Sequence, residues 1–304
     1  MSDDIADTEM VVKLPYSLHS RYASIAIAWT IIITPPIFIN LGLLYGLWYG
    51  KPEMDRIAVL TIPTAVLGIF TVIALVERIW KLVQLSPEFR PLKSPRYALD
   101  IFQWGYFAAL IMISALISST LLRGDTDNDE HEFQIRLLSI PAPILMCFLA
   151  TLTLISLILN GLQVKLPFRF GSSDAGNVVR PAIYYIVEDV IAVDGNGGVE
   201  YREAFTARYD GSPLFRKMIW TLSLVWMLAF YLFASVFTIL VFKLPKAAVY
   251  AVGWAGPFPL AGLMAVWTIF YAKSVLKKEE DESRVPVNGQ HREDERAPLL
   301  GNEV

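Results

Sequence analysis

Six stretches of this sequence are long and apolar enough to cross a lipid bilayer. A helix needs about 20 apolar residues to cross a hydrocarbon core of about 30 Å, because each backbone amide must be satisfied within the helix. Hydrophobic residues make up 55% of the 304 residues, more than soluble domains usually contain. The sequence predicts an all-α polytopic membrane protein with six transmembrane helices, at residues 24–49, 57–76, 99–122, 137–162, 218–242 and 247–272.

Proline interrupts the first of these stretches. Pro35 and Pro36 remove two backbone donors, so we expect the helix to kink or break at this point. Asn40 follows shortly after and is the best candidate for a polar side chain lining a cavity. The alternative for Asn40 is a hydrogen bond between helices. Further prolines disturb later spans, namely Pro63, Pro141, Pro143, Pro257 and Pro259.

Charge predicts the orientation of the chain. Lysine and arginine gather after the second, fourth and sixth spans, whereas five carboxylates outnumber two arginines after the third. Because basic loops stay in the cytosol, both termini and the insert at 163–217 are expected there. We therefore divide the chain into a cytosolic segment 1–23, a membrane domain 24–272 that includes the insert, and a disordered cytosolic tail 273–304.

Several classes of chemistry lack the residues that they need. His19, His131 and His291 lie outside the predicted spans, which excludes a bis-histidine haem. Cys147 is the single cysteine, so neither a disulfide nor a cysteine-based metal site can form within the chain. No ionisable residue lies in the middle of a span, which disfavours an ion-coupled transporter. We expect no catalytic residues, metal, cofactor or nucleic-acid partner.

The insert between the fourth and fifth spans reads as an amphipathic helical hairpin. Pro181 suits a first helical turn, and apolar residues then follow with helical spacing at Ile183, Ile186, Val187, Val190 and Ile191. Glu188 and Asp189 are expected elsewhere on the helix surface. The run DGNGG at 194–198 predicts a turn. It does not fit a calcium loop that begins at Asp194, because Val199 and Phe205 occupy the sixth and twelfth positions, where such a loop needs Gly and Glu.

Basic residues of the insert suggest what it binds. Arg202, Arg208 and Arg216 are expected to recognise anionic lipid headgroups, since an anionic leaflet attracts each nearby basic residue by about 1 kcal/mol. The alternative is that these arginines only set topology and pair with the carboxylates of the insert, which are Glu188, Asp189, Glu200 and Glu203.

Two stretches carry a resemblance. The segment RPAIYYIVEDVIAVDGNGGVEYREAFTARYDGSPLFR, together with RPLKSPRYALD before the third span, resembles a block in uncharacterised multi-pass membrane proteins of filamentous fungi. The resemblance implies a membrane fold over most of the chain. It brings no catalytic or ligand-binding residues with it.

The end of the chain resembles an acidic dileucine sorting signal. Glu295 precedes Leu299 and Leu300 in a charged stretch, and such tails offer two leucines to a clathrin-adaptor complex. We therefore favour a non-enzymatic protein of an endomembrane, with the vacuolar membrane first and the plasma membrane possible. Its hairpin would bind lipid or protein. A small-solute transporter or channel is the alternative, and an integral-membrane enzyme is the second alternative.

Overall fold

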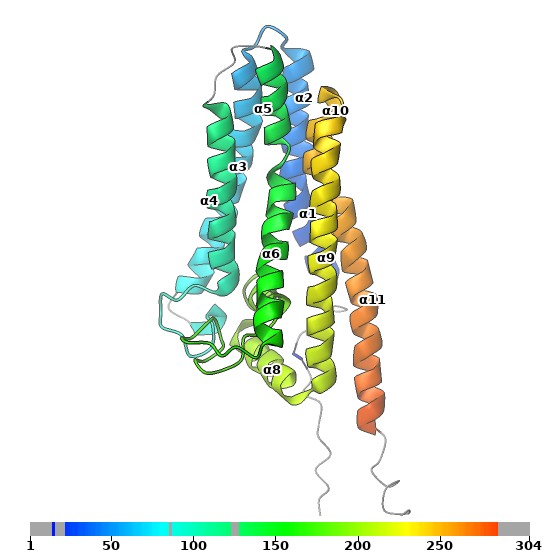
Figure 1. Ribbon diagram of the computed structural model, residues 1–304. Helices are drawn as coiled ribbons and strands as arrows, with labels where there is room; N and C mark the ends of the chain where they lie inside the picture. Colours follow the sequence, from blue (N-terminus) through cyan, green and yellow to red (C-terminus); the bar gives the residue numbers. More distant parts are fainter. Residues whose placement is uncertain (1–13, 16–21, 85–86, 123–127, 285–304) are drawn as a thin grey trace, which may run out of the picture.

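The computed structural model describes residues 14–15, 22–84, 87–122 and 128–284. Within these residues, six helical stretches are long and apolar enough to span a membrane, and they run lengthwise as one bundle (Figure 1). The prediction of an all-α polytopic membrane protein is confirmed. The spans are Trp29–Gly50, Ala58–Val83, Ile101–Leu121, Pro141–Gly161, Pro213–Lys243 and Ala247–Asp281.

The first span is interrupted, as its prolines predict. It consists of α1 (Tyr22–Ile33), the π-helical turn η2 (Thr34–Ile39) and α2 (Asn40–Gly50). Pro35 and Pro36 lie in the π-helical turn, where the N–H of Asn40 donates to the carbonyl of Pro35. This widened turn lets the helix continue past two prolines that have no backbone N–H to donate.

The sixth span is also interrupted and packs on the first. It consists of α10 (Lys246–Ala255) and α11 (Pro257–Arg284). The Tyr250 hydroxyl donates to Oδ1 of buried Asn40 at 3.1 Å, and the Tyr45 hydroxyl donates to the carbonyl of Ala247 at 2.6 Å. Asn40 therefore makes the hydrogen bond between helices that was the alternative for this residue.

The remaining spans are α3, α4, α6 and α9. Their bounds are α3 (Arg56–Val83), α4 (Ile101–Leu121), α6 (Pro141–Gly161) and α9 (Pro213–Lys243), with η3 (Pro87–Phe89) between α3 and α4 and α5 (Asn128–Leu138) before α6. α6 and α9 run side by side (Figure 1), with Ala150 and Leu157 packed on Met227. At 1.5 Å per residue, the 31 residues of α9 extend about 46 Å, beyond a hydrocarbon core of about 30 Å.

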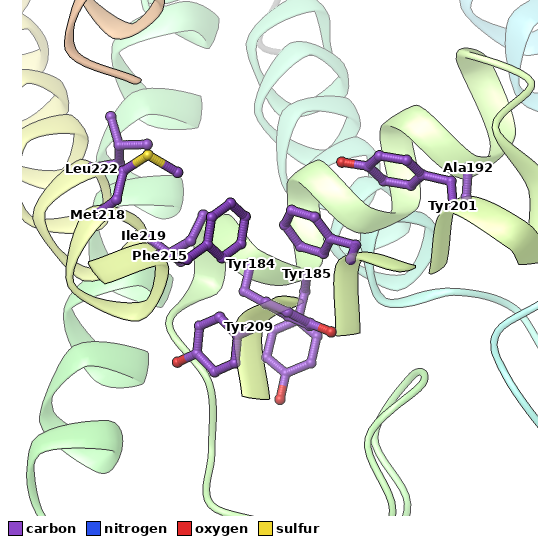
Figure 2. Packing of buried hydrophobic residues seen from close by; sticks show 10 residues of the cluster. Tyr184, Tyr185, Ala192, Tyr201, Tyr209, Phe215, Met218, Ile219 and Leu222 are labelled. Atoms are coloured by element: carbon purple, nitrogen blue, oxygen red, sulfur yellow. The ribbon is translucent and has the colours of Figure 1, made fainter. Parts of the chain in front are cut away.

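Residues 163–212, which we call the cap, close one end of the bundle (Figure 1). The cap contains α7 (Ala182–Asp189), the π-helical turn η4 (Val190–Asp194) and α8 (Gly198–Gly211). Its core is aromatic, and Figure 2 shows the rings gathered beside the start of α9. The core side chains include Tyr184, Tyr185, Tyr201, Phe205 and Tyr209 from the cap and Phe215, Met218, Ile219 and Leu222 from α9.

The face of α7 that points into the protein differs from our prediction. Glu188 and Asp189 were expected on the helix surface, but they are buried, together with Tyr184 and Tyr185. The expected surface placement was wrong because distant charged residues meet these two carboxyls inside the fold. The predicted apolar stripe that includes Ile183 and Val187 is only partly buried.

The turn between η4 and α8 depends on a glycine. Gly198 has a φ of +62°, a conformation that side chains with a Cβ rarely adopt. A Cβ added there would also lie 3.1 Å from the carbonyl oxygen of Glu88. The turn predicted at 194–198 is therefore held against η3 by close backbone packing.

The last helix is longer than predicted. A disordered tail was expected to begin at residue 273, but α11 continues to Arg284. Glu279 is buried and accepts hydrogen bonds from Arg208 of α8 and from the Ser212 hydroxyl before α9. The end of α11 is thereby anchored to the cap. Residues 285–304, including Glu295, Leu299 and Leu300, lie outside the described residues.

Candidate functional site

A basic pocket lies where the cap meets the ends of α6 and α9. Its volume is about 520 Å³. Ten residues line it: Asn160, Gln163, Asn177, Val178, Arg180, Tyr209, Asp210, Arg216, Lys217 and Trp220. The pocket thus combines basic side chains, amides and one tryptophan at the boundary between the apolar spans and the polar cap.

Positive charge exceeds negative charge in this pocket. Arg180, Arg216 and Lys217 contribute three positive charges, and Asp210 contributes one negative charge. Arg216 is exposed, and its Nη1 donates to the carbonyls of Tyr209 at 3.2 Å and Asp210 at 2.6 Å. Lys217 is exposed and has no ion pair among the described residues. The pocket can therefore attract an anion.

Arg180 is the rigid member of the pocket. Its Nη2 donates to both carboxylate oxygens of Asp210, at 2.8 and 3.0 Å, and its guanidinium lies 4.5 Å from the ring centre of Tyr184 and 5.0 Å from that of Tyr209. Burial raises the pKa of Tyr184 and raises the pKa of Tyr209 to about 12. Both phenols therefore stay protonated near neutral pH and cannot act as bases there.

A second polar arrangement, which we call the ionic cluster, is buried on another side of the cap. Arg202 of α8 is fully buried at its centre. Its Nη1 donates to Asp189 at 2.6 Å and to Glu188 at 3.1 Å, both on α7. Its Nη2 donates to the backbone carbonyl of Phe89 at 3.3 Å and lies 3.8 Å from Asp100.

Arg78 and Asp100 connect the ionic cluster to the membrane helices. Nη2 of Arg78, on α3, donates to Asp100 at 2.6 Å, and Nη1 donates to Asp194 of η4. Asp100 is the N-cap of α4 and accepts the Gln103 N–H at 2.8 Å. The cluster members are Arg78, Asp100, Glu188, Asp189, Asp194 and Arg202, and they join the cap to α3 and α4.

Burial changes how two of these carboxyls titrate. Burial, followed by the charge of Asp100, raises the pKa of Asp189 to about 7, although Arg202 opposes this change. Burial likewise raises the pKa of Glu188 against the attraction of Arg202. These directions follow because low-polarity surroundings disfavour the charged form of a carboxyl.

The three arginines predicted to bind lipid have different surroundings. Arg202 is enclosed in the ionic cluster, so its side chain does not reach the surface. Arg208 is 11% exposed, pairs with Glu279 and lies 5.1 Å from the ring centre of Phe215. Arg216 lines the basic pocket. The pairing of Arg202 with Glu188 and Asp189 is part of the alternative that the sequence left open.

Sequence reasoning missed the partners that complete both arrangements. Arg180 and Lys217 line the pocket, and Arg78 and Asp100 complete the ionic cluster. The available signal was the position of Arg78 and Asp100 at the boundaries of apolar spans. Among the described residues, no group of His, Cys, Asp or Glu is arranged to hold a metal ion.

The fold and these sites define a polytopic α-helical membrane protein with a polar cap at one end. The chain belongs to the family described as Domain of unknown function (DUF8766), whose model matches residues 2–283. The match includes the cap and all the spans, so both are parts of the family's domain. Comparison with curated proteins and with solved structures gives no match.

Proposed function

We propose that this protein is a non-enzymatic integral membrane protein that binds anionic lipid headgroups in the basic pocket of a cytosolic cap. The observation that carries the proposal is the placement of Arg180, Arg216 and Lys217 around one pocket with a single carboxylate, Asp210. Basic groups of this kind attract anionic headgroups, and each contributes about 1 kcal/mol of attraction near an anionic leaflet.

The donors of the pocket suit a phosphate-bearing headgroup. Arg180 is held by Asp210 and by two aromatic rings, so its guanidinium is positioned before a ligand arrives. Arg216 and Lys217 are exposed. Asn160, Gln163 and Asn177 add amide groups to the lining. A fixed arginine beside exposed basic side chains can bind phosphate by charge-assisted hydrogen bonds.

The position of the pocket favours a lipid over a soluble anion. It lies at the end of α6 and the beginning of α9, and Trp220 of α9 is both part of its lining and 39% exposed. Tryptophan is enriched at the depth of lipid headgroups. A ligand whose phosphate occupies the pocket could therefore leave its acyl chains beside the spans.

This proposal revises the residues of the lipid hypothesis. Arg216 is retained because it lines the pocket, and Arg180 and Lys217 are added. Arg202 and Arg208 are left out because neither of them lines the pocket, and buried carboxylates pair with both. Replacing Arg202 would disturb the cap and could not test headgroup binding.

Lipid retention by the purified full chain in nanodiscs tests the proposal. Arg216→Gln with Lys217→Gln should retain at least several-fold less phosphoinositide and phosphatidylserine than wild type, while phosphatidylcholine is unchanged. Added salt should reduce the difference. Lys273→Gln with Lys277→Gln is the matched control, because it removes two exposed basic charges of α11 outside the pocket lining.

The outcomes separate a lipid from a soluble anion. Equal retention by the pocket variant and wild type would overturn the proposal. Soluble inositol phosphate that binds wild type as tightly as the intact lipid would assign the pocket to a soluble ligand instead. Equal losses in the pocket and control variants would show that only the total charge matters.

The location and traffic of the protein are part of this proposal. We favour an endomembrane, with the vacuolar membrane first, because Glu295, Leu299 and Leu300 have the spacing of an acidic dileucine signal. A clathrin-adaptor complex is the partner proposed for that signal.

A small-solute transporter is the second candidate function. The observation that favours it is the packing of the interrupted first span on the interrupted sixth span through Asn40 and Tyr250. Interrupted helices near the middle of a bundle often surround transport sites. Nδ2 of Asn40 is buried and has no hydrogen-bond partner in the described part of the chain.

A further inference from the structure

The ionic cluster contains more negative than positive groups. Four carboxyls and two guanidiniums belong to it, so complete ionisation would leave a net charge of −2. Asp100, Glu188 and Asp189 are buried. A buried charge without compensation is so costly that a carboxyl in this position takes up a proton instead.

The hydrogen bonds indicate which carboxyls compete for compensation. Asp100 accepts from the Arg78 guanidinium and from the Gln103 N–H. Glu188 and Asp189 both accept from one nitrogen, Nη1 of Arg202, at 3.1 and 2.6 Å, and Glu188 also accepts a hydrogen bond from Ser172. Asp189 also accepts the Phe102 N–H at 3.0 Å. One guanidinium nitrogen therefore serves two adjacent acids.

We propose that the Glu188–Asp189 pair is a proton-binding site, which holds one proton while the cap is docked on α3 and α4. The proton binds to a carboxylate oxygen of the pair and comes from water, and no other bond forms or breaks. Its uptake removes one of the two uncompensated negative charges. The cap is therefore docked more tightly in mild acid than in mild alkali.

The groups around the pair come from every side of the cap. α8 contributes Arg202, the segment before α4 contributes Asp100, and the segment before α7 contributes Arg180, which attracts Glu188. Arg78 of α3 and Asp194 of η4 complete the cluster. α6 and α9 pack on α7 mainly through uncharged side chains, such as Ser156, Phe215 and Met218.

Several polar atoms beside the pair have no hydrogen-bond partner among the described residues. Nε of Arg202 and of Arg78 are buried without a hydrogen bond in the described residues, as are both amide atoms of Gln103, one turn into α4. Buried atoms of this kind usually bind internal water. The Asp194 side chain is 44% exposed and links the cluster to solvent.

The sign of the pH dependence follows from the titration of the pair. Burial raises the pKa of Asp189 to about 7 from its usual acidic value, and it raises the pKa of Glu188 as well. The docked state therefore binds more protons than the undocked state between those values. Docking strengthens as pH falls through about 7, by up to about tenfold per pH unit for one proton.

The test uses wild type and three variants of the full chain in nanodiscs. Glu188→Gln comes first, since it fixes the pair at the charge of its singly protonated form. Hydrogen–deuterium exchange of α7 and α8 is measured from about pH 8 to about pH 5.5, with exchange times scaled for the intrinsic pH effect. Wild type should become several-fold more protected in acid. Glu188→Gln should be well protected at both pH values. Glu200→Gln, an exposed carboxyl on α8, should behave like wild type.

Asp189→Asn provides the same test if Glu188→Gln fails to fold. Infrared spectra of wild type provide a readout without mutation, because a protonated buried carboxyl has a band that ionised carboxylates lack. That band should appear between the two pH values and should be absent from the Glu188→Gln variant. The proposal would be overturned by wild type that shows no change in protection or lacks the band, or by a Glu188→Gln variant that keeps the wild-type pH dependence.

Discussion

Arg202 determines whether the buried carboxyls of the cap are compensated. It is fully buried and donates to Asp189 and Glu188, with Asp100 nearby. Arg202→Gln would leave these acids without their shared cation, and removal of one partner from a buried ion pair costs about 3–5 kcal/mol. We expect thermal unfolding in detergent at a clearly lower temperature than for wild type.

Arg216→Gln is the contrasting change at the same scale. Arg216 is exposed and, within the described part of the chain, donates to the backbone carbonyls of Tyr209 and Asp210. Surface substitutions of this kind usually change stability by less than about 0.5 kcal/mol. If the two variants unfolded at the same temperature, the assignment of a stabilising structural role to Arg202 would be wrong.

At the scale of residues, the sequence indicates which side chains can pair but not whether they are buried. Arg202, Glu188 and Asp189 could be named as possible partners because they lie in one insert. Their burial could not be predicted, because Arg78 and Asp100 come from helices far away in the sequence. Arg180 and Lys217 share a pocket only after α6, α8 and α9 have packed together.

At the scale of elements, one carboxyl holds the end of α11 against the cap. Glu279 accepts from Arg208 and Ser212, and hydrogen bonds to charged groups are worth about 1.5–3 kcal/mol. Glu279→Gln should therefore loosen the last turns of α11 without unfolding the bundle. Trypsin should cleave after Lys273, Lys277 and Lys278 several-fold faster than in wild type.

Asp281→Asn is the control for this prediction, because it removes an exposed carboxyl from the same helix. It should leave the cleavage rate near that of wild type. Equal cleavage of the Glu279 variant and wild type would show that packing of α11 on α9, and not the Glu279 contact, holds the helix end.

The elements differ in how far the sequence predicts them. The six spans follow from local hydropathy, and the break of the first span follows from two prolines that cannot donate hydrogen bonds. The extension of α11 could not be predicted, because residues 273–284 are mostly charged and their helix is fixed by a tertiary contact through Glu279. α5 likewise forms in an interval that looked like an acidic loop.

For the whole molecule, orientation decides whether the basic pocket faces the cytosolic leaflet. The cap and the loop after α2 lie at opposite ends of the bundle (Figure 1), and each has an exposed carboxyl, Glu200 on α8 and Glu53 after α2. Basic residues gather on the cap side, which predicts that this end is cytosolic. The headgroup proposal requires this orientation, because anionic lipids are concentrated in the cytosolic leaflet.

Cysteine labelling tests the orientation in sealed vesicles with the cytosolic side outward. Cys147→Ser removes the native thiol, and Glu200→Cys or Glu53→Cys then supplies a single thiol at a known end. A membrane-impermeant maleimide should label Glu200→Cys directly and Glu53→Cys only after detergent opens the vesicles. The reverse pattern would place the cap on the lumenal side, away from the lipids that the basic pocket is proposed to bind.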